Sequence, residues 1–561
     1  HQDRWRCTAA MGRKAGLRSK LAHLSEDLNL DSKKIKTNLV NFFCVPTPAG
    51  KRRMLQDYPD KARDFAEYCL QDVRAEQEIT RRLAPFELKG RSLEVFQFTN
   101  RLNRRGIPVN IPALRNAQRI IEEVDLDTGA RFFALTGLRH TQRDKVFQWL
   151  RARGYPGENM QAETVQEVMA DIYQMQPEAV DALTLYSELA YAAAKKVTAM
   201  LAAVCSGGTV KGTLLYHGAG TGRWAGRGIQ PQNFKKPTIS GDLALAFAMI
   251  SEGGSREALE LTFGPALEVV ASVIRNFIGL PAGLLDADYA AIEARVVNWI
   301  AGQDDVVKLF REGKDLYKRM GAIIYTLPEE AIGKSSMERQ LGKQAVLGCG
   351  YGMGPDKFLE TCLGYGIQIS PDLAKLAVTK YREAHPRVVR MWKDLDRAAK
   401  DCVASPGSWC PVASNPAVRF ITTEISGMPY MLMRLPSGRT LAYPKPEVKR
   451  VWKEEWKEFA QELSYWGQLP GKSIMGRVKL YGGKLMENLV QAIAADLMAH
   501  GALTAEARGF DLFALIHDQA LAANDPRGCA PFIAALTDLP AWAEGLPLKA
   551  EGDWAPYYRK D

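Results

Sequence analysis

The chain lacks the sequence features of several protein classes. Its nine cysteines include no Cys-x-x-Cys pair, so we expect neither a zinc site nor a disulfide framework, and a reducing compartment fits best. No apolar stretch predicts a membrane span, because 243–250 is short and 269–285 is interrupted by Arg275. The chain starts at His1 with no charged and then apolar leader, so no secretory signal is expected. There is also no internal repeat or low-complexity segment.

The composition is that of a globular protein with a basic surface. A chain of 561 residues is too long for one hydrophobic core, so we expect two to four domains. Hydrophobic residues make up 46% and charged residues 25%, which excludes a largely disordered chain. The net charge of +10 favours a polyanionic partner, although most surface lysines are simply solvated.

Segment 284–295, Leu-Leu-Asp-Ala-Asp-Tyr-Ala-Ala-Ile-Glu-Ala-Arg, predicts a strand followed directly by a helix. The apolar run up to Leu285 suits a buried strand, and apolar residues then recur at the spacing of an amphipathic helix. Asp288 therefore lies at the rim of a sheet. A carboxylate there can hold a hard cation such as Mg²⁺, although a lone acidic residue at a strand end is more often solvated.

Segment 512–521, Leu-Phe-Ala-Leu-Ile-His-Asp-Gln-Ala-Leu, predicts two apolar strands around an acidic turn. Asp518 would project from the tip of this hairpin. Because a two-metal site needs a second carboxylate, Asp518 is the candidate partner of Asp288.

Segment 337–354 predicts a helix with functional side chains at successive spacings of four. These side chains are Arg339, Lys343, Leu347 and Tyr351. Because four residues turn a helix by about 400°, the row drifts only slowly around one side. Two cations followed by an apolar side chain and a ring suit a triphosphate followed by a sugar and a base.

The alternative for this helix is an amphipathic helix with a basic edge. Three glycines, at positions 348, 350 and 352, disfavour that alternative, since each costs about 1 kcal/mol relative to alanine inside a helix. We expect glycines there because the backbone approaches a ligand or partner closely.

Together the three segments resemble the family A DNA polymerases, the family of bacterial DNA polymerase I and its phage relatives. Asp288-Tyr289-x-x-Ile292-Glu293 is similar to motif A, the helix from Arg339 to motif B, and His517-Asp518 to motif C. The resemblance implies a DNA-directed DNA polymerase, a nucleotidyltransferase that acts in DNA replication.

The resemblance is strong over 206–561, looser over 92–205 and weak before that, and 221–233 and 341–354 look phage-like. It implies an α+β multidomain protein with the right-hand polymerase fold, an antiparallel-sheet palm, helical fingers and a helical thumb. An N-terminal remnant of an RNase H-like exonuclease domain would precede them. The implied domains are the partial exonuclease 1–88, the thumb 92–205, the first palm part 206–302, the fingers 303–402 and the second palm part 403–561.

The resemblance also implies a site. Two Mg²⁺ ions would be held by Asp288, Tyr289 and Asp518, and Lys343 would join Asp288 and Asp518 as a catalytic residue. The residues implied to bind the incoming deoxynucleoside triphosphate are Arg339, Lys343, Leu347, Tyr351, Glu293 and Tyr317. The residues implied to contact primer-template DNA are Arg223, Gln232, Asn233, Gln491 and His517. In the family, the side chain matched by Glu293 fills the space that a ribose 2′-hydroxyl would need.

Three positions depart from the family pattern. Leu347 stands where the family usually has an aromatic residue, and Tyr317 stands where a histidine contacts phosphate. Gln519 replaces the glutamate that usually follows motif C, so metal binding would depend on Asp288 and Asp518 alone.

Segment 66–73 predicts a helix with Tyr68 and Asp72 on one face, which looks like the last motif of the family's 3′-5′ exonuclease domain. Residues 1–67 contain no Asp-x-Glu tripeptide, which that domain needs. Because one carboxylate cannot hold two metals, we favour the alternative that both residues belong to an ordinary amphipathic helix, and we expect no proofreading in this chain.

The expected partners are primer-template DNA and deoxynucleoside triphosphates, with no membrane, for a monomer in the cytoplasm of a bacterial or phage-infected cell. Arg101, Arg104 and Arg105 in the predicted thumb, and the pair Lys195-Lys196, are candidate phosphate contacts. The rival function is a non-catalytic nucleic-acid-binding protein that kept the fold.

Overall fold

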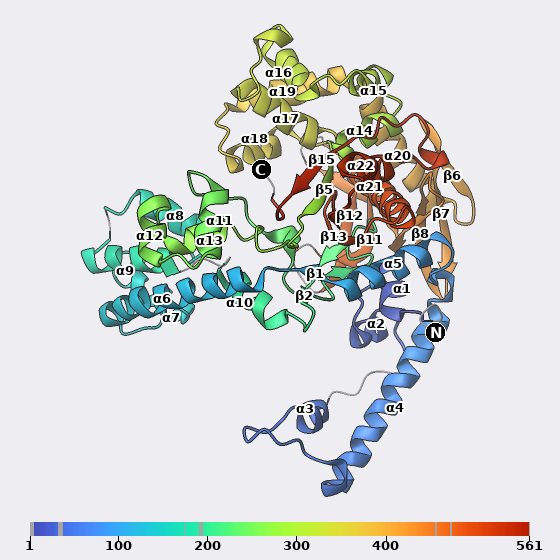
Figure 1. The fold of residues 1–561 in the computed structure, drawn as a ribbon. Coiled ribbons are helices and arrows are strands. Elements are labelled where there is room, and N and C mark those ends of the chain that lie inside the picture. The colour runs from blue at the N-terminus through green and yellow to red at the C-terminus, as the bar shows by residue number, and fades with distance from the viewer. Residues whose placement is uncertain are drawn as a thin grey trace.

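The computed structural model describes residues 5–31, 37–173, 175–189, 194–454, 457–469, 471 and 474–559. Its centre is a four-stranded antiparallel sheet, which confirms the expected palm architecture (Figure 1). Across the sheet the strands are β13 (Leu512–Ile516), β14 (Gln519–Ala523), β5 (Leu284–Tyr289) and β15 (Ala550–Ala555). Segments from the middle and the end of the chain thus form one sheet.

The central sheet is covered by apolar contacts on both faces. Alternate residues of β5, namely Leu285, Ala287 and Tyr289, belong to the same core as helices α14 (Ile292–Ile300), α21 (Gly482–Ala507) and α22 (Cys529–Leu536). Leu284 and Phe513 belong to a second core on the other face. Because side chains alternate along a strand, Asp286 and Asp288 lie on this second face, toward its open end.

The second core joins the sheet to a cluster of helices that lies apart from the rest in Figure 1. Its helices are α6 (Ile111–Thr136), α7 (Arg143–Arg151), α8 (Ala162–Ala170), α9 (Pro177–Leu189), α10 (Ala194–Ala203), α11 (Leu243–Ser251), α12 (Arg256–Phe263) and α13 (Ala266–Ser272). Helices α11 and α13 pack against α6, so 243–272 lies with the expected thumb and not with the palm to which the sequence assigned it. The reason is that the apolar faces of these helices complete the core of α6 and α9.

Helix α5 (Arg91–Arg105) also packs on a different part of the protein from the one that the sequence analysis expected. The sequence placed it in the thumb, but it packs against β13 and α21 of the palm. It ends at Gly106, whose φ of 79° few other residues adopt, and the short strands β1 (Ile107–Pro108) and β2 (Thr209–Val210) then pair. The expected break at 106–108 thus coincides with the end of α5, while the domain bounds stay a prediction.

A helical block separates the two sheet-forming parts, as expected for 303–402. It contains α15 (Asp304–Arg311), α16 (Leu316–Tyr325), α17 (Met337–Cys349), α18 (Pro355–Gly364), α19 (Pro371–Ala384) and α20 (Pro386–Ala404). Helix α20 also packs along α21 and against the sheet that follows it, so the block and the palm share one core.

Two further antiparallel sheets follow α20, in agreement with the β-type runs seen in the sequence. One contains β6 (Trp409–Val412), β7 (Asn415–Ile425), β8 (Met428–Arg434) and β9 (Thr440–Pro444). The other contains β10 (Glu447–Lys453), β11 (Glu458–Gln468) and β12 (Met475–Leu480). Two short strands, β3 (Leu214–Leu215) and β4 (Ala225–Gly226), form a hairpin before them in the chain.

The N-terminal segment packs against the second sheet region through α1 (Thr8–Lys14) and α2 (Leu21–Asp27), which share a small core with Tyr430 of β8. Helix α4 (Pro59–Arg82) then projects away from the body, with α3 (Leu39–Cys44) near its outer end (Figure 1). Tyr68 and Asp72 both lie on α4, as predicted. Among the residues described, no helix is both long and apolar enough to cross a lipid bilayer.

Helices α16 and α17 approach each other closely at two glycines. A Cβ on Gly342 would overlap with the carbonyl oxygen of Tyr317, and one on Gly321 would lie 2.5 Å from the carbonyl oxygen of Glu338. Gly348, also on α17, faces only the flexible side chain of Met353.

We predict that Gly342→Ala lowers the stability of the protein by about 1–3 kcal/mol, because the added methyl group forces the two helices apart. The matched control Gly348→Ala should be neutral or stabilising by up to about 1 kcal/mol, since alanine favours the helix. The midpoint of thermal unfolding measures both effects. Equal midpoints for the two variants would contradict the close approach.

Candidate active site

The structure brings Asp288 and Asp518 to the same end of the central sheet, where β5 ends and β14 begins. Asp288, near the end of β5, is the register partner of Gln519 in β14. His517 and Asp518 form the turn between β13 and β14, as predicted for a hairpin tip, and His517 adopts a φ of 57° there. The amide of Tyr289 donates to the carbonyl oxygen of Asp518 over 3.0 Å, which ties the turn to the end of β5. Both carboxylates are half-buried.

Tyr289 cannot serve as a metal ligand through its side chain. Its ring is 3% exposed, and its hydroxyl donates to the carbonyl oxygen of Leu536 at 2.5 Å, on the helical face of the sheet. Burial raises the pKa of Tyr289, so the phenol stays protonated. The metal ligation expected of Tyr289 stays a prediction, and it would have to come from the main-chain carbonyl oxygen of this residue.

Gln519 occupies a buried position between two other polar groups. Its amide nitrogen donates to Oδ1 of Asp286 at 2.6 Å, and its amide oxygen accepts from the hydroxyl of Tyr558 at 3.0 Å. Asp286 lies two residues before Asp288 and on the same face of β5. A second acidic side chain thus adjoins Gln519, the position where the family's glutamate is missing.

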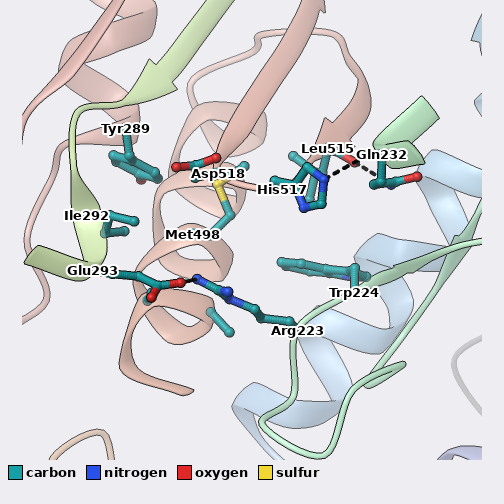
Figure 2. A pocket seen from close by; sticks show the side chains of 12 residues that line it. Arg223, Trp224, Gln232, Tyr289, Ile292, Glu293, Met498, Leu515, His517 and Asp518 are labelled. Carbon is teal, nitrogen blue, oxygen red and sulfur yellow. Dashed lines mark hydrogen bonds and ion pairs between the residues drawn. The ribbon is translucent and has the colours of Figure 1, made fainter. Parts of the chain in front are cut away.

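Glu293, at the start of α14, is held from two sides. Nη2 of Arg223 donates to one carboxylate oxygen at 2.6 Å, and the hydroxyl of Tyr351 donates to the other at 2.6 Å. Figure 2 shows the arginine reaching across to this glutamate. Burial and the neighbouring Glu293 carboxylate raise the pKa of Tyr351 well above its ordinary value, so the tyrosine remains a donor.

A pocket of about 270 Å³ lies between these groups. It is lined by Arg223, Trp224, Gln232, Tyr289, Ile292, Glu293, Ala494, Ala495, Met498, Leu515, His517 and Asp518 (Figure 2). Two predicted metal ligands, Tyr289 and Asp518, the predicted sugar-selecting residue and three predicted DNA-contacting residues therefore line one cavity. Nε2 of His517 lies 2.9 Å from the carbonyl oxygen of Gln232, which places two of these residues side by side.

Two predicted DNA contacts lie outside this pocket lining. Asn233 follows Gln232 in a short 3₁₀ turn, and its amide donates to Oε1 of Gln230 at 2.8 Å. Gln491 is half-buried on α21 about one turn before Ala494, and its amide donates to Glu487 at 3.2 Å. Both residues are close in sequence to residues that line the cavity, and both have intramolecular hydrogen-bond partners in this conformation.

Helix α17 carries the predicted nucleotide-binding row, but it ends earlier than predicted. Its last helical residue is Cys349, Gly350 follows as the cap, and Gly352 adopts a φ of 76°. Arg339, Lys343 and Leu347 therefore lie on the helix, whereas Tyr351 follows its end. The backbone of Gly352 is left-handed, as is common just after a helix end, and the hydroxyl of Tyr351 reaches Glu293.

The predicted reason for the three glycines is also corrected. Gly348 adjoins the side chain of Met353, Gly350 lies at the helix end beside Tyr381, and Gly352 packs against Gly483 of α21. The carbonyl oxygen of Gly350 accepts from the indole of Trp392 at 2.9 Å. These glycines serve the end of the helix and its packing on the palm.

Arg339 is oriented by a residue that the sequence analysis did not identify. Asp315 caps α16 and accepts from Nε of Arg339 at 2.8 Å. Although burial opposes it, the hydrogen bonds from Arg339 and from two amides of α16 hold the pKa of Asp315 below its ordinary value. The guanidinium lies 5.5 Å from the ring centroid of Tyr317, so Tyr317 is beside the predicted phosphate-binding cation.

Lys343 and Leu347 are the accessible members of the row. Leu347 is 40% exposed, and Lys343 is half-buried. Within the described ranges of the chain, Lys343 forms no ion pair. A cation and an apolar side chain thus remain open on this side of α17.

The arginines expected to contact phosphate in the thumb instead fasten α5 to the palm. Arg101 forms a two-pronged ion pair with Glu506 of α21, at 3.1 and 2.5 Å, and Arg105 pairs with Asp511 at 2.8 Å. Arg104 donates to the carbonyl oxygen of Asn100 in its own helix at 3.3 Å. In this conformation the guanidinium groups of Arg101 and Arg105 are paired with carboxylates, and their contact with phosphate stays a prediction.

Three residues of the site escaped the sequence analysis. Asp286 could have been found, because a residue two positions from Asp288 in a strand shares its face. Asp315 and Tyr558 left no local signal, since each reaches its partner through the tertiary fold.

Comparison with known proteins agrees with this geometry. A family model described as DNA polymerase family A matches residues 147–404. The DNA polymerase of Bacillus phage SP02 is 32% identical, in an alignment covering 99% of this chain and 86% of that protein. The thermostable DNA polymerase I of Thermus aquaticus is 29% identical over 119 residues, which are 21% of this chain and 13% of that protein.

Among solved structures, the POL domain of Pol1 from M. smegmatis, in complex with DNA primer-template and dNTP, aligns with a TM-score of 0.57 and 15% identity. The alignment covers 98% of this chain and 81% of that one, and it supports the shared fold. The phage relative is similar over nearly the full length of this chain, so it is the stronger evidence for the family. The chain belongs to DNA polymerase family A, and it is a DNA-directed DNA polymerase.

Proposed function

We propose that this polymerase adds deoxynucleotides to the 3′-hydroxyl of a primer on a DNA template, with release of pyrophosphate, at a site built on Asp288 and Asp518. The observation that carries the proposal is the pairing of β5 with β14. This pairing brings both carboxylates to one end of the sheet, beside a pocket. Primer-template DNA and dNTP accompany the related solved structure, and we propose the same ligands here.

The donor set suits Mg²⁺. Two carboxylates and a main-chain carbonyl are hard oxygen ligands, and Mg²⁺ is often bound by one or two carboxylates together with substrate phosphates. Two bound Mg²⁺ ions would activate the primer hydroxyl and neutralise the leaving pyrophosphate. Asp288 and Asp518 would hold them, and the Tyr289 carbonyl would complete the set.

The side chains on α17 would receive the triphosphate. Arg339, held in place by Asp315, offers its remaining guanidinium donors to phosphate oxygens. Lys343, one turn further, would offset phosphate charge and donate a proton to the leaving group. Tyr317 lies beside Arg339, so it would border the phosphates, and the exposed Leu347 would face the sugar or base.

Glu293 would select the sugar. Its carboxylate is fixed by Arg223 and Tyr351, so it cannot swing away from the pocket without breaking two short hydrogen bonds. A rigid side chain rejects an added hydroxyl better than a mobile one. The unused donors of Arg223, with Gln232 and His517, would contact the primer-template in the minor groove, where acceptors occur on every base pair.

The expected absence of proofreading stays a prediction. Tyr68 and Asp72 lie on α4, which projects from the body, and we propose that they mark the end of an exonuclease-like domain whose bounds are 1–88. The thumb and fingers are likewise proposed for the helical cluster around α6 and the block around α17.

We predict that Asp288→Asn or Asp518→Asn abolishes nucleotide incorporation while primer-template binding persists. Loss of a metal ligand removes several kcal/mol of transition-state stabilisation, which is about 10²-fold or more in rate. Primer extension with Mg²⁺ measures the rate, and a gel-shift titration measures binding. Asp525→Asn, two residues beyond the end of β14, is the control and should retain activity. Full activity in either site variant would end the proposal, and no activity in the unaltered chain would favour a non-catalytic DNA-binding protein.

We predict that Glu293→Ala raises the efficiency of ribonucleotide incorporation relative to deoxynucleotides by about tenfold or more, because it opens space for the 2′-hydroxyl. Tyr351→Phe removes one of the two hydrogen bonds on Glu293 and should give a smaller rise. Single-nucleotide incorporation kinetics with paired ribo- and deoxynucleotides measure both. An unchanged ratio in Glu293→Ala would contradict the assignment.

We predict that Gln519→Glu is destabilising at neutral pH. The new carboxylate would lie beside Asp286, so the pair would share a proton and its pKa would rise. A carboxylic acid with a raised folded-state pKa loses stability as pH rises, here by about 1–3 kcal/mol at pH 7, at 1.36 kcal/mol for each pKa unit. Thermal unfolding midpoints between pH 5 and 8 test this, and adding Asp286→Asn should restore the midpoint. A loss independent of pH would contradict it.

A further inference from the structure

A second pocket lies behind Trp224 and carries a marked excess of positive charge. It has a volume of about 400 Å³ and is enclosed by the N-terminal segment, the Trp224 loop, α21 and the turn at 437–440. We call it the cationic pocket. Its charged lining consists of Lys14, Lys89, Arg91 and Arg439, with the one carboxylate Asp496. His217 and His500 also line it.

His217 is a buried imidazole with unused hydrogen-bonding capacity. It is 4% exposed, and neither ring nitrogen has a hydrogen-bond partner within the part of the chain that the structure describes. Burial and the cations Arg439, Arg13 and Lys14 lower the pKa of His217 to about 3, so it is neutral at pH 7. A buried polar ring without a partner is unfavourable unless a ligand supplies one.

Arg439, which also lines the pocket, repeats this pattern. Its Nε donates to Asp496 at 2.6 Å and its Nη2 to the carbonyl oxygen of Ala492 at 2.8 Å, but its buried Nη1 has no partner among the described residues. That atom points at Gly222, where a Cβ would overlap with it. The loop bearing Arg223 and Trp224 therefore passes directly over the open donor.

The remaining cations are only partly neutralised. Lys89 pairs with Glu87 at 3.1 Å, and Arg91 pairs with Glu94 at 3.1 Å on the exposed side of α5. Lys14 donates to the carbonyl oxygen of Glu87 at 3.3 Å, and it forms no ion pair with any residue that the structure describes. Burial, Arg439 and Lys89 lower the pKa of Lys14, as expected where cations converge. The lining of the pocket thus keeps an excess of positive charge, which an anionic ligand would neutralise.

The cationic pocket adjoins the proposed active site. Trp224 and Ala495 line both cavities, so the indole and one turn of α21 form the wall between them. A nucleic-acid strand that occupies the first cavity can therefore continue past Trp224 toward the second. Phosphate oxygens accept hydrogen bonds from Arg, Lys and a neutral His at once, which a single carboxylate does less well.

We propose that the cationic pocket binds a phosphate group, supplied by the backbone of the DNA strand that the polymerase holds. The choice of a strand phosphate rests on the proposed function, whereas the phosphate chemistry itself does not. Because Lys14, Lys89 and Arg91 come from the N-terminal part of the chain and Arg439 and His217 from the polymerase part, the bound phosphate would join these two parts.

The test compares Lys14→Met, which keeps the apolar stem but removes the charge, with Lys14→Arg, which keeps the charge. Lys380→Met, on α19, where the half-buried Lys380 pairs with Glu383 at 3.0 Å, is the matched control. The affinity of the full chain for a primer-template duplex is measured by fluorescence anisotropy over a series of salt concentrations. For Lys14→Met we expect about tenfold weaker binding and a slope of log affinity against log salt that is smaller by about 0.9, the value for one phosphate. Lys14→Arg and Lys380→Met should match the unaltered chain.

Calorimetric titration of the same variants with inorganic phosphate and with pyrophosphate separates the two sources of phosphate. Weaker duplex binding with unchanged pyrophosphate binding assigns the pocket to the strand. Loss of phosphate or pyrophosphate binding alone keeps the phosphate site but overturns the strand assignment. Unchanged binding of all three ligands by Lys14→Met overturns the proposal. None of these measurements needs nucleotide incorporation, so failure of primer extension would contradict the proposed function separately.

Discussion

The antiparallel pairing of β5 with β14 is the constraint on which the site depends. It fixes Asp288 opposite Gln519 and brings the His517–Asp518 turn onto the end of β5, where the Tyr289 amide binds the Asp518 carbonyl. The pairing is stable because alternate residues of β5 are buried against α14, α21 and α22. If the register of β5 shifted by one residue, the side chain of Asp288 would point into that apolar core. The register that buries the apolar residues of β5 therefore also keeps the carboxylates out of the core.

Glu293 connects three parts of the protein that are separate in the chain. Arg223 comes from the loop after the helical cluster, Glu293 from the palm and Tyr351 from the end of the block containing α17. The hydrogen bonds between them cross the pocket wall, so movement of α17 relative to the palm must either carry Glu293 along or release it. The same loop that places Arg223 also covers the cationic pocket through Gly222 and Trp224. Events in the two cavities are thus linked by one short segment.

The departures from the family pattern are partly offset by neighbouring residues. Gln519 lacks a negative charge, but it donates to Asp286, which lies on the same strand face as Asp288. A carboxylate therefore lies beside Gln519, two residues before Asp288 on the same strand. Tyr317 similarly stays beside Arg339 although it is not a histidine. Leu347 differs from these two positions because its side chain is 40% exposed.

The sequence by itself determined the local elements and the chemistry they carry: the strand and helix around Asp288, the hairpin tip at Asp518 and the cationic face of α17. Those features depend on periodicity and turn residues, which are local. Only the tertiary structure decided where α17 ends and which partners Arg101, Arg339 and Gln519 take. It also decided that α5 packs on the central sheet region and that the helices at 243–272 pack against α6. Each of these outcomes depends on packing between distant segments, and packing leaves no fixed spacing in the chain from which it could be read.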